Sequence, residues 1–267
     1  MYTIYIFLYF LPLIICQYDI DIIKTAVNIS QSTYCVIDNN WDCKTCSRIN
    51  IYEKIYSNKG ELAIYGYNTK YKMNFIGFRG SSNIKNWITN IQFDIIYPYG
   101  KSIGIEKGFY NLFYSLKNDI YDDIKLLVEK NNNNNIIITG HSLGGAISTL
   151  LSFDILFNNL PYNVYLITFG SPRVGNKNFV EYFNNYEIYS KRITHYYDIV
   201  PHLPQSFLNY QHIPNEIWYN LENSDYKDCD DYGNEDISCS NSCAPTQCTS
   251  VDDHLYYMNL TMGINGC

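Results

Sequence analysis

The spacing of apolar residues along the chain predicts strands that alternate with helices. Apolar runs of strand length are bounded by polar turn residues, whereas the segment 109–128 repeats apolar side chains every three or four positions, as one face of a helix does. The predicted strands cover residues 62–67, 73–78, 136–138, 164–169 and 191–196, and the predicted helices cover residues 109–128 and 146–156. Because helices connect parallel strands, this order indicates an α/β fold with a mostly parallel central sheet.

The two ends of the chain depart from this pattern. Tyr2–Cys16 is an almost unbroken apolar run, too short for the roughly 20 residues that span a bilayer. It predicts a signal peptide over residues 1–16, and therefore a secreted protein whose single mature domain covers residues 17–267. A buried first helix is the alternative. After Asp198 the chain is rich in Pro, Asn, Asp and Cys, which predicts a loop-rich end held by disulfides.

The cysteines and glycosylation sequons agree with export. The chain has nine cysteines, and removal of Cys16 with the leader leaves an even number, as expected when all of them pair. Cys43 and Cys46 have the spacing of half a zinc site, but no second pair of that spacing follows, so we expect no bound metal. Asn28 and Asn259 open N-linked sequons and are predicted glycosylation sites.

Composition limits the class of partner. The 267 residues are 46% hydrophobic, which suffices for one well-filled core. The formal net charge is −7 and the arginines are scattered, so the chain lacks the basic cluster that binds phosphate backbones. We therefore exclude nucleic acid as a partner.

Ser142 has the sequence context of a nucleophile. It lies in Gly140-His141-Ser142-Leu143-Gly144, between a predicted strand and a predicted helix. A strand that turns abruptly into a helix crowds the positions two residues before and after the serine, and both are glycine here. The turn lifts the hydroxyl out of the sheet and aims the free N–H groups of the helix at a developing negative charge. An ordinary helix N-cap is the alternative interpretation of Ser142.

A nucleophilic serine needs a base, and the base needs an acid that orients it. In this kind of fold the acid and then the histidine follow the serine along the chain. Asp198 follows a predicted strand and is the expected acid. Spacing alone leaves the base open among His202, His212 and His254, although nearby cysteines would fix the loop of His254. Such a triad requires no metal and no organic cofactor.

Six short motifs follow one another along the chain, namely Phe78–Ser82, Asn86–Ile88, Gly140–Gly145, Pro172–Gly175, Asp198–Pro204 and Asp253–Leu255. Together they resemble the class 3 lipases, the filamentous-fungal triacylglycerol lipase family. The resemblance covers roughly residues 34–267. It implies an α/β-hydrolase fold, with helices on both faces of the sheet and a short helical lid.

The resemblance also implies roles for individual residues. Ser142 would be the nucleophile, Asp198 the orienting acid and His254 the general base and acid. Ser81 and the backbone N–H of Leu143 would form the oxyanion hole, in which each donor is worth about 3–4 kcal/mol of barrier.

Three disulfides follow from the same resemblance: Cys35–Cys267, Cys43–Cys46 and Cys229–Cys239. Cys243 and Cys248 then remain as a fourth pair, which looks additional to the usual framework.

The segment after the oxyanion serine is predicted to be a lid. Within residues 82–93, four apolar residues fall at spacings of three and four and so share one helical face, namely Ile84, Trp87, Ile88 and Ile91. A mobile amphipathic helix beside the nucleophile suits a lipid interface and would form part of the substrate-binding surface. A fixed surface helix that packs its tryptophan inward is the alternative.

The sequence therefore predicts a secreted serine ester hydrolase, in the first place a triacylglycerol lipase that works through an acyl-enzyme. A phospholipase A1 or a cinnamoyl (feruloyl) esterase of the same family is the main alternative, and a non-catalytic lipid-binding protein is a remote one. The expected partners are a lipid or other ester substrate and, transiently, a lipid–water interface. We expect a monomer without cofactor.

Overall fold

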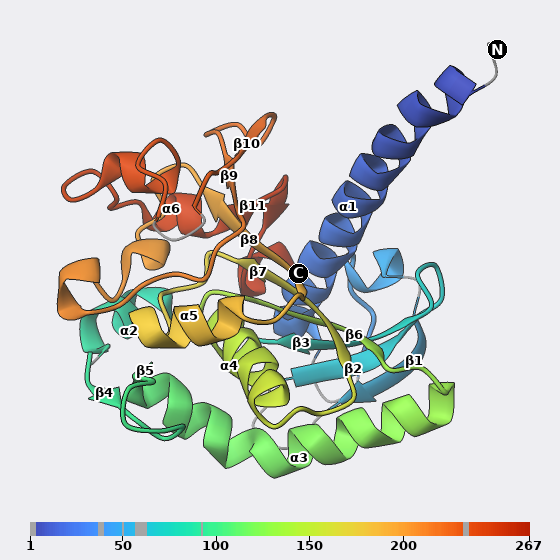
Figure 1. The fold of residues 1–267 in the computed structure, drawn as a ribbon, viewed down its shortest axis with the longest axis horizontal. Coiled ribbons are helices and arrows are strands. Elements are labelled where there is room, and N and C mark those ends of the chain that lie inside the picture. Colours follow the sequence, from blue (N-terminus) through green and yellow to red (C-terminus); the bar gives the residue numbers. More distant parts are fainter. Residues whose placement is uncertain (1–3, 37–39, 50, 57–62, 92, 232–234) are drawn as a thin grey trace.

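The computed structural model describes the chain except residues 1–3, 37–39, 50, 57–62, 92 and 232–234, and it describes no side chains at 4–19, 51–56 and 90. Within this part of the chain an eight-stranded sheet forms the centre (Figure 1). Across the sheet the strands are β1 (Ile51–Tyr56), β2 (Ala63–Asn68), β3 (Met73–Phe78), β6 (Asn135–His141), β7 (Asn163–Phe169), β8 (Tyr189–His195), β9 (Glu216–Tyr219) and β10 (Tyr226–Asp228). The run from β3 to β9 is parallel, whereas β1, β2 and β10 pair antiparallel at the two edges.

Helices cover both faces of the sheet (Figure 1). The helix α1 (Ile4–Cys35) packs on one face against β3, β6 and β7. On the other face lie α3 (Lys107–Asn131), α4 (Leu143–Phe157) and α5 (Lys177–Asn184). Each face therefore encloses its own cluster of buried apolar side chains, which is the layered solution for a sheet that is hydrophobic on both sides.

Shorter elements occupy the connections between these strands and helices and the C-terminal part of the chain. They are α2 (Ile84–Asn90), α6 (Val251–His254), the hairpins β4 (Ile95–Ile96) with β5 (Ile105–Glu106) and β11 (Tyr256–Tyr257) with β12 (Leu260–Thr261), and the 3-10 turns η1 (Cys46–Arg48), η2 (Val200–His202), η3 (Ser206–Leu208), η4 (Ser240–Cys243) and η5 (Ile264–Gly266). In open parallel sheets, sites form outside the carboxyl ends of the strands, which is where α2 follows β3 and η2 follows β8.

The long helix α3 shows why the sequence folds as it does. Its buried positions are spaced by three to seven residues along one face, and they are Phe109, Phe113, Ile120, Ile124 and Leu127. The Glu106 carboxylate accepts the N–H of Phe109 at 2.6 Å and so caps the first turn. The helix ends before Asn132, which adopts the left-handed conformation at φ 46°.

The predicted strands and helices are confirmed, with longer boundaries in most cases. The strand predicted from Leu62 begins at Ala63, because Leu62 lies outside the described residues. The edge strands β1, β9 and β10 and the part of α1 that follows the leader were not predicted.

The predicted signal peptide, residues 1–16, falls where residues 1–3 and all side chains are outside the described part. It stays a prediction. Among the helices that the structure describes, none combines the length and the apolar character needed to cross a bilayer.

Four disulfides fasten the described chain, and they join the same cysteines as predicted. They are Cys35–Cys267, Cys43–Cys46, Cys229–Cys239 and Cys243–Cys248. The first ties the end of α1 to the last residue of the chain, whereas the last two staple the loops that precede α6.

Candidate active site

Ser142 sits at the sharp turn between β6 and α4. Its backbone has φ 60° and ψ −128°, a strained conformation for a residue with a side chain. A Cβ on Gly140 would lie 2.3 Å from the backbone of Gly144, and one on Gly144 would lie 2.1 Å from the carbonyl oxygen of Phe78. Both positions therefore require glycine, as the sequence motif predicts.

Asp198 and His254 meet next to this turn. The two come from the loop after β8 and from the end of α6, and His254 Nδ1 lies 2.8 Å from Asp198 Oδ2. Tyr257 donates its hydroxyl to the same oxygen at 2.5 Å, and the N–H of Val200 donates to Asp198 Oδ1 at 2.8 Å. Because Nδ1 donates to the carboxylate, His254 Nε2 is the free, basic nitrogen.

The side chain of Tyr257 stays neutral in this arrangement. It is fully buried, and burial together with the negative charge of Asp198 raises the pKa of its hydroxyl well above the usual value. Tyr257 is thus a permanent hydrogen-bond donor to the acid and shares Oδ2 of the carboxylate with His254.

Ser142 Oγ and His254 Nε2 are both buried and have no hydrogen-bond partner within the described part of the chain. They line one cavity of about 90 Å³ together with Ser81. A buried polar atom without a partner costs about 1–3 kcal/mol, so two of them at one cavity indicate a site that is kept ready for a reacting molecule.

The residues predicted to supply oxyanion donors lie next to Ser142 in space or along the chain. Ser81 lies on the loop between β3 and α2 and lines the cavity with Ser142. The neighbouring Gly80 passes so close that a Cβ there would lie 3.1 Å from the Cβ of Ser142. Leu143 is the first residue of α4, where backbone N–H groups have no partner inside the helix. The turn and this loop together can present donors to a developing oxyanion.

A buried pair beneath the site was not predicted. His141 Nε2 lies 2.8 Å from the carbonyl oxygen of His254, and its Nδ1 lies 2.8 Å from the hydroxyl of Tyr34 on α1. A carbonyl only accepts, so Nε2 carries the proton and Nδ1 accepts from Tyr34. Burial lowers the pKa of His141 and raises that of Tyr34, which keeps both neutral.

The hydroxyl of Tyr34 also contacts the oxyanion loop. A Cβ on Gly80 would lie 2.1 Å from it, and the backbone of Gly80 hydrogen-bonds to it. Tyr34 and His141 therefore connect α1, the loop of Ser81 and the backbone of His254. Within the sequence, the position of His141 inside the serine motif was the only local sign of this pair.

The other candidate bases lie elsewhere. His212 is buried and donates through Nε2 to the carbonyl of Pro201 at 2.6 Å. His202 lies beside the Cys243–Cys248 disulfide, and burial followed by the charge of Arg173 lowers its pKa to about 4. Neither lines the cavity of Ser142, so the geometry favours His254 as the base.

The helix α2 covers the site. Asn83 caps it by accepting the N–H of Asn86 at 3.1 Å. The indole of Trp87 stacks on Phe109 with ring centroids 6.2 Å apart, and the predicted apolar face is half-buried while Lys85 is exposed. Ser142 is only 1% exposed, so a substrate cannot reach the nucleophile in this conformation.

An apolar cavity of about 350 Å³ lies between α2 and α3. Trp87, Ile91, Phe109, Leu112 and Leu143 supply its apolar wall. Leu143, which directly follows the nucleophile, lines this cavity, so an apolar space large enough for part of an acyl chain lies close to Ser142.

Two clusters of potential metal ligands occur in the described residues. One contains His202 with Cys243 and Cys248, and the other contains Cys229, Asp236 and Cys239. All four sulfurs are bonded in disulfides, so they do not offer the thiolates that zinc binds.

The predicted glycosylation sites differ in accessibility. Asn28 is half-buried on α1 and donates its amide to the carbonyl of Lys24, whereas Asn259 is exposed at the turn between β11 and β12. Glycosylation of either residue stays a prediction.

Comparison with known proteins agrees with this geometry. The model of the family described as lipase (class 3) matches residues 75–208. The chain is 29% identical to a lipase of Rhizomucor miehei over 92% of this chain and 70% of that protein. It is 30% identical to a lipase of Rhizopus niveus over 88% of this chain and 62% of that protein.

Solved structures give the same result. The propeptide complex of Rhizomucor miehei lipase superimposes with a TM-score of 0.82 at 30% identity, over 92% of this chain and 82% of that one. A triacylglycerol lipase whose catalytic centre is described as a serine protease triad has a TM-score of 0.81 at 30% identity, over 92% and 96%. A chloroplastic phospholipase A1 of Arabidopsis thaliana is 29% identical over 50% of this chain and 31% of that protein.

Proposed function

We propose that this chain, which belongs to the class 3 lipase family and is an ester hydrolase, cleaves acylglycerol esters with Ser142, His254 and Asp198. The observation that carries the proposal is the pair of unpartnered buried atoms, Ser142 Oγ and His254 Nε2, at one cavity, with His254 held by Asp198 at 2.8 Å.

The proposed reaction has two halves. Ser142 Oγ attacks the ester carbonyl while His254 Nε2 takes the proton of the serine hydroxyl. The backbone N–H of Leu143 and the donors of Ser81 stabilise the oxyanion that forms. His254 then protonates the leaving alcohol, and the acyl group remains on Ser142. Water attacks this acyl-enzyme with His254 again as base, which releases the fatty acid and restores the serine. Asp198 keeps the imidazole oriented and stabilises its charged form throughout.

The substrate class is proposed from the shape of the site and from the relatives. The closed α2 and the apolar wall formed by Trp87, Phe109 and Leu112 suit an acyl chain, and the similar fungal proteins are named lipases. Opening of α2 would expose its apolar face, which a lipid surface can cover. We also propose that the chain is secreted after removal of residues 1–16, because the leader pattern, the disulfides and a relative named as a secreted mono- and diacylglycerol lipase agree.

A substrate panel tests the function. The purified protein is given emulsified trioctanoin, tributyrin across its solubility limit, phosphatidylcholine and methyl ferulate, with Ser142→Ala as the control. We expect the highest turnover on the acylglycerols, a rise when tributyrin forms an emulsion, and fluorophosphonate labelling that Ser142→Ala abolishes. Preferred turnover of phosphatidylcholine would instead make the protein a phospholipase A1, and an unlabelled parent would contradict an enzymatic function.

A further inference from the structure

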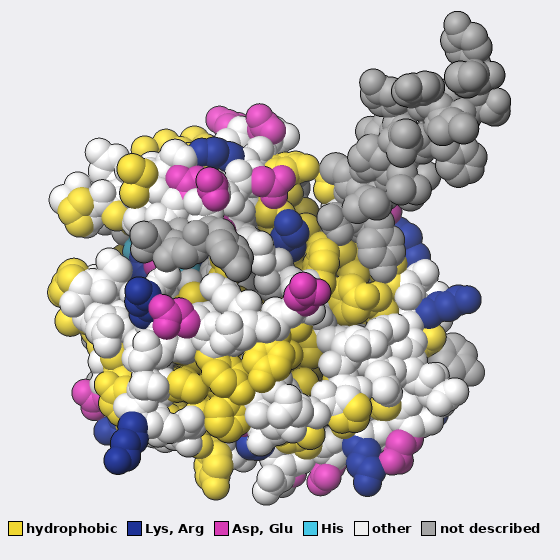
Figure 2. All heavy atoms as spheres, viewed as in Figure 1, with side chains coloured by type: hydrophobic (Ala, Val, Ile, Leu, Met, Phe, Trp, Pro, Cys, Tyr) yellow, Lys and Arg dark blue, Asp and Glu magenta, His cyan; other side chains and the backbone are white. Residues whose placement is uncertain are grey.

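Two strongly exposed apolar side chains lie outside the lid. Phe207 on η3 is 82% exposed and Ile237 in the loop before η4 is 79% exposed. Figure 2 shows hydrophobic side chains along its left edge, over the orange and red segments that carry these two regions in Figure 1. The same edge carries α2 and β4 (Figure 1).

The two loops adjoin each other and the end of the lid segment. Ser206, Tyr210 and Ile237 line one open cavity of about 470 Å³, so the loop of Phe207 and the loop of Ile237 face each other across it. Tyr210 donates its hydroxyl to the carbonyl of Phe93, the last residue of the lid segment, at 3.2 Å. The two apolar side chains therefore continue the surface that an opened α2 would present.

Both loops are fixed by one buried cation. Arg173 Nε lies 2.7 Å from Glu235, its second guanidinium nitrogen makes a 2.5 Å ion pair with the same carboxylate, and Nη1 donates to the carbonyl of Pro204 at 2.9 Å. Glu235 is two residues before Ile237, and Pro204 is three residues before Phe207. The paired Arg173 side chain is only 3% exposed, so this brace is shielded from water and holds both loops together.

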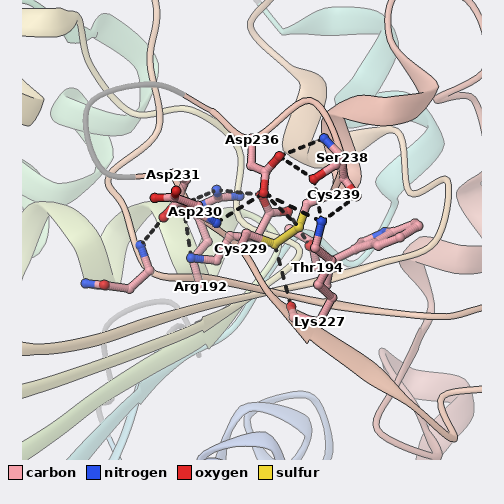
Figure 3. The surroundings of a disulfide bond; sticks show 12 residues. Arg192, Thr194, Lys227, Cys229, Asp230, Asp231, Asp236, Ser238 and Cys239 are labelled. Atoms are coloured by element: carbon pink, nitrogen blue, oxygen red, sulfur yellow. Dashed lines mark hydrogen bonds and ion pairs between the residues drawn. A yellow bond between two sulfur atoms is a disulfide. The ribbon is translucent and has the colours of Figure 1, made fainter.

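The turn that carries Ile237 has a second brace, which Figure 3 shows. The Cys229–Cys239 disulfide closes this loop. Asp236 accepts the N–H and the hydroxyl of Ser238 at 2.7 and 2.6 Å, and thereby fixes the residues on both sides of Ile237. The exposed side chain thus projects from a turn that is already ordered, which lowers the entropic cost of binding.

We propose that Phe207 and Ile237 form a fixed anchor that inserts into an uncharged lipid surface and holds the enzyme there while α2 opens. This inference rests on the proposed function, since it assumes that the substrate is presented as a lipid phase. Two protruding side chains offer far less contact area than the roughly 800 Å² that each partner buries in a stable protein interface. Insertion into fluid lipid needs no complementary partner, and the net charge of −7 disfavours an anionic surface.

Binding is measured without hydrolysis in the Ser142→Ala background. Partition of the protein onto trioctanoin droplets is determined by flotation for this parent and for Phe207→Ser, Ile237→Ser and the double variant. We expect each single substitution to weaken partition about tenfold, and the double variant more, because each removes a side chain that lipid would bury. Leu126→Ser is the matched control, because its side chain is also exposed, at 53%. At 1.5 Å per residue, Leu126 lies about 28 Å along α3 from Lys107, the first residue of that helix. Partition of this variant should therefore not change.

Three results would overturn the anchor. They are a double variant that partitions like the parent, a parent that stays in the aqueous phase, and a double variant whose only change is a lower mass in sedimentation, which would assign the patch to self-association. A parent that partitions through Phe207 and Ile237, while the Ser142-containing protein leaves trioctanoin intact, would keep the anchor and contradict the proposed function instead.

Discussion

The triad and the lid lie within one site but are held in opposite ways. Asp198 is buried and accepts hydrogen bonds from Tyr257, Val200 and His254, so the acid and the base are both fixed in place. The apolar face of α2 is half-buried, and its aromatic contact is one stacked pair with Phe109. The comparison shows that the proposed acid and base are held in place before a substrate binds, and it favours α2 as the part that would move if a lipid surface opened the site.

The largest expected effect comes from breaking the rigid part. His254→Ala and Ser142→Ala should each lower kcat/KM on any ester by about four orders of magnitude or more, because the members of a triad act as a unit. His212→Gln keeps a hydrogen-bonding side chain at a position outside the cavity and should retain most activity once folded. Initial rates on a soluble nitrophenyl ester and on emulsion measure the effect. Substantial turnover in folded His254→Ala would contradict the assignment.

The next effect concerns how acid acts on the stability of the fold that holds the triad. Burial lowers the pKa of His202 to about 4 in the folded protein, against about 6.5 when unfolded. Between these values the unfolded chain binds a proton that the folded chain does not, so stability falls as the pH drops from about 6.5 and the loss is complete near pH 4. At about 1.4 kcal/mol for each pKa unit this amounts to ~3 kcal/mol. The pKa values of His141 and His212, also lowered by burial, act in the same direction.

Urea unfolding at several pH values tests this sign. The free energy of unfolding should decline between pH 7 and pH 4.5, and His202→Gln should flatten that decline. Parallel curves for the parent and the variant would show that His202 does not contribute. α2 contains no histidine and should add nothing to this dependence.

How far the sequence alone could go depends on how local each feature is. The Ser142 turn was predictable because both glycines and the flanking strand and helix lie within a few residues of it. The choice of His254 was not local, and spacing left His202 and His212 open until a family resemblance was added. The Tyr34–His141 contact joins residues 107 positions apart, and no pattern in either segment predicts it. Such contacts depend on burial and tertiary packing, and the periodicity of the sequence does not encode them.

A third prediction targets this unpredicted pair. Tyr34→Phe removes the hydroxyl that donates to His141 and contacts the loop of Ser81, so it should lower kcat about tenfold while KM changes little. The reason is that Nδ1 of His141 would become a buried acceptor without a donor, which costs about 1–3 kcal/mol. This cost falls on His141 and the loop of Ser81, which position the site. Tyr121→Phe is the matched control, since it loses a 2.6 Å bond to Asp154 outside the catalytic cavity. It should lower stability but not kcat.

The last expected effect tests whether α2 moves. Trp87→Ser removes the largest apolar side chain of α2, which packs on Phe109 when the lid is closed and would be buried in lipid when it is open. Burying such a side chain is worth about 1.5–3 kcal/mol, so the ratio of emulsion activity to soluble-ester activity should fall about tenfold. Lys85→Ser, on the exposed face of the same helix, should leave the ratio unchanged. If Trp87→Ser lowers both activities equally, α2 is a fixed helix whose tryptophan belongs to the core, and the contrast between a rigid triad and a mobile lid does not hold.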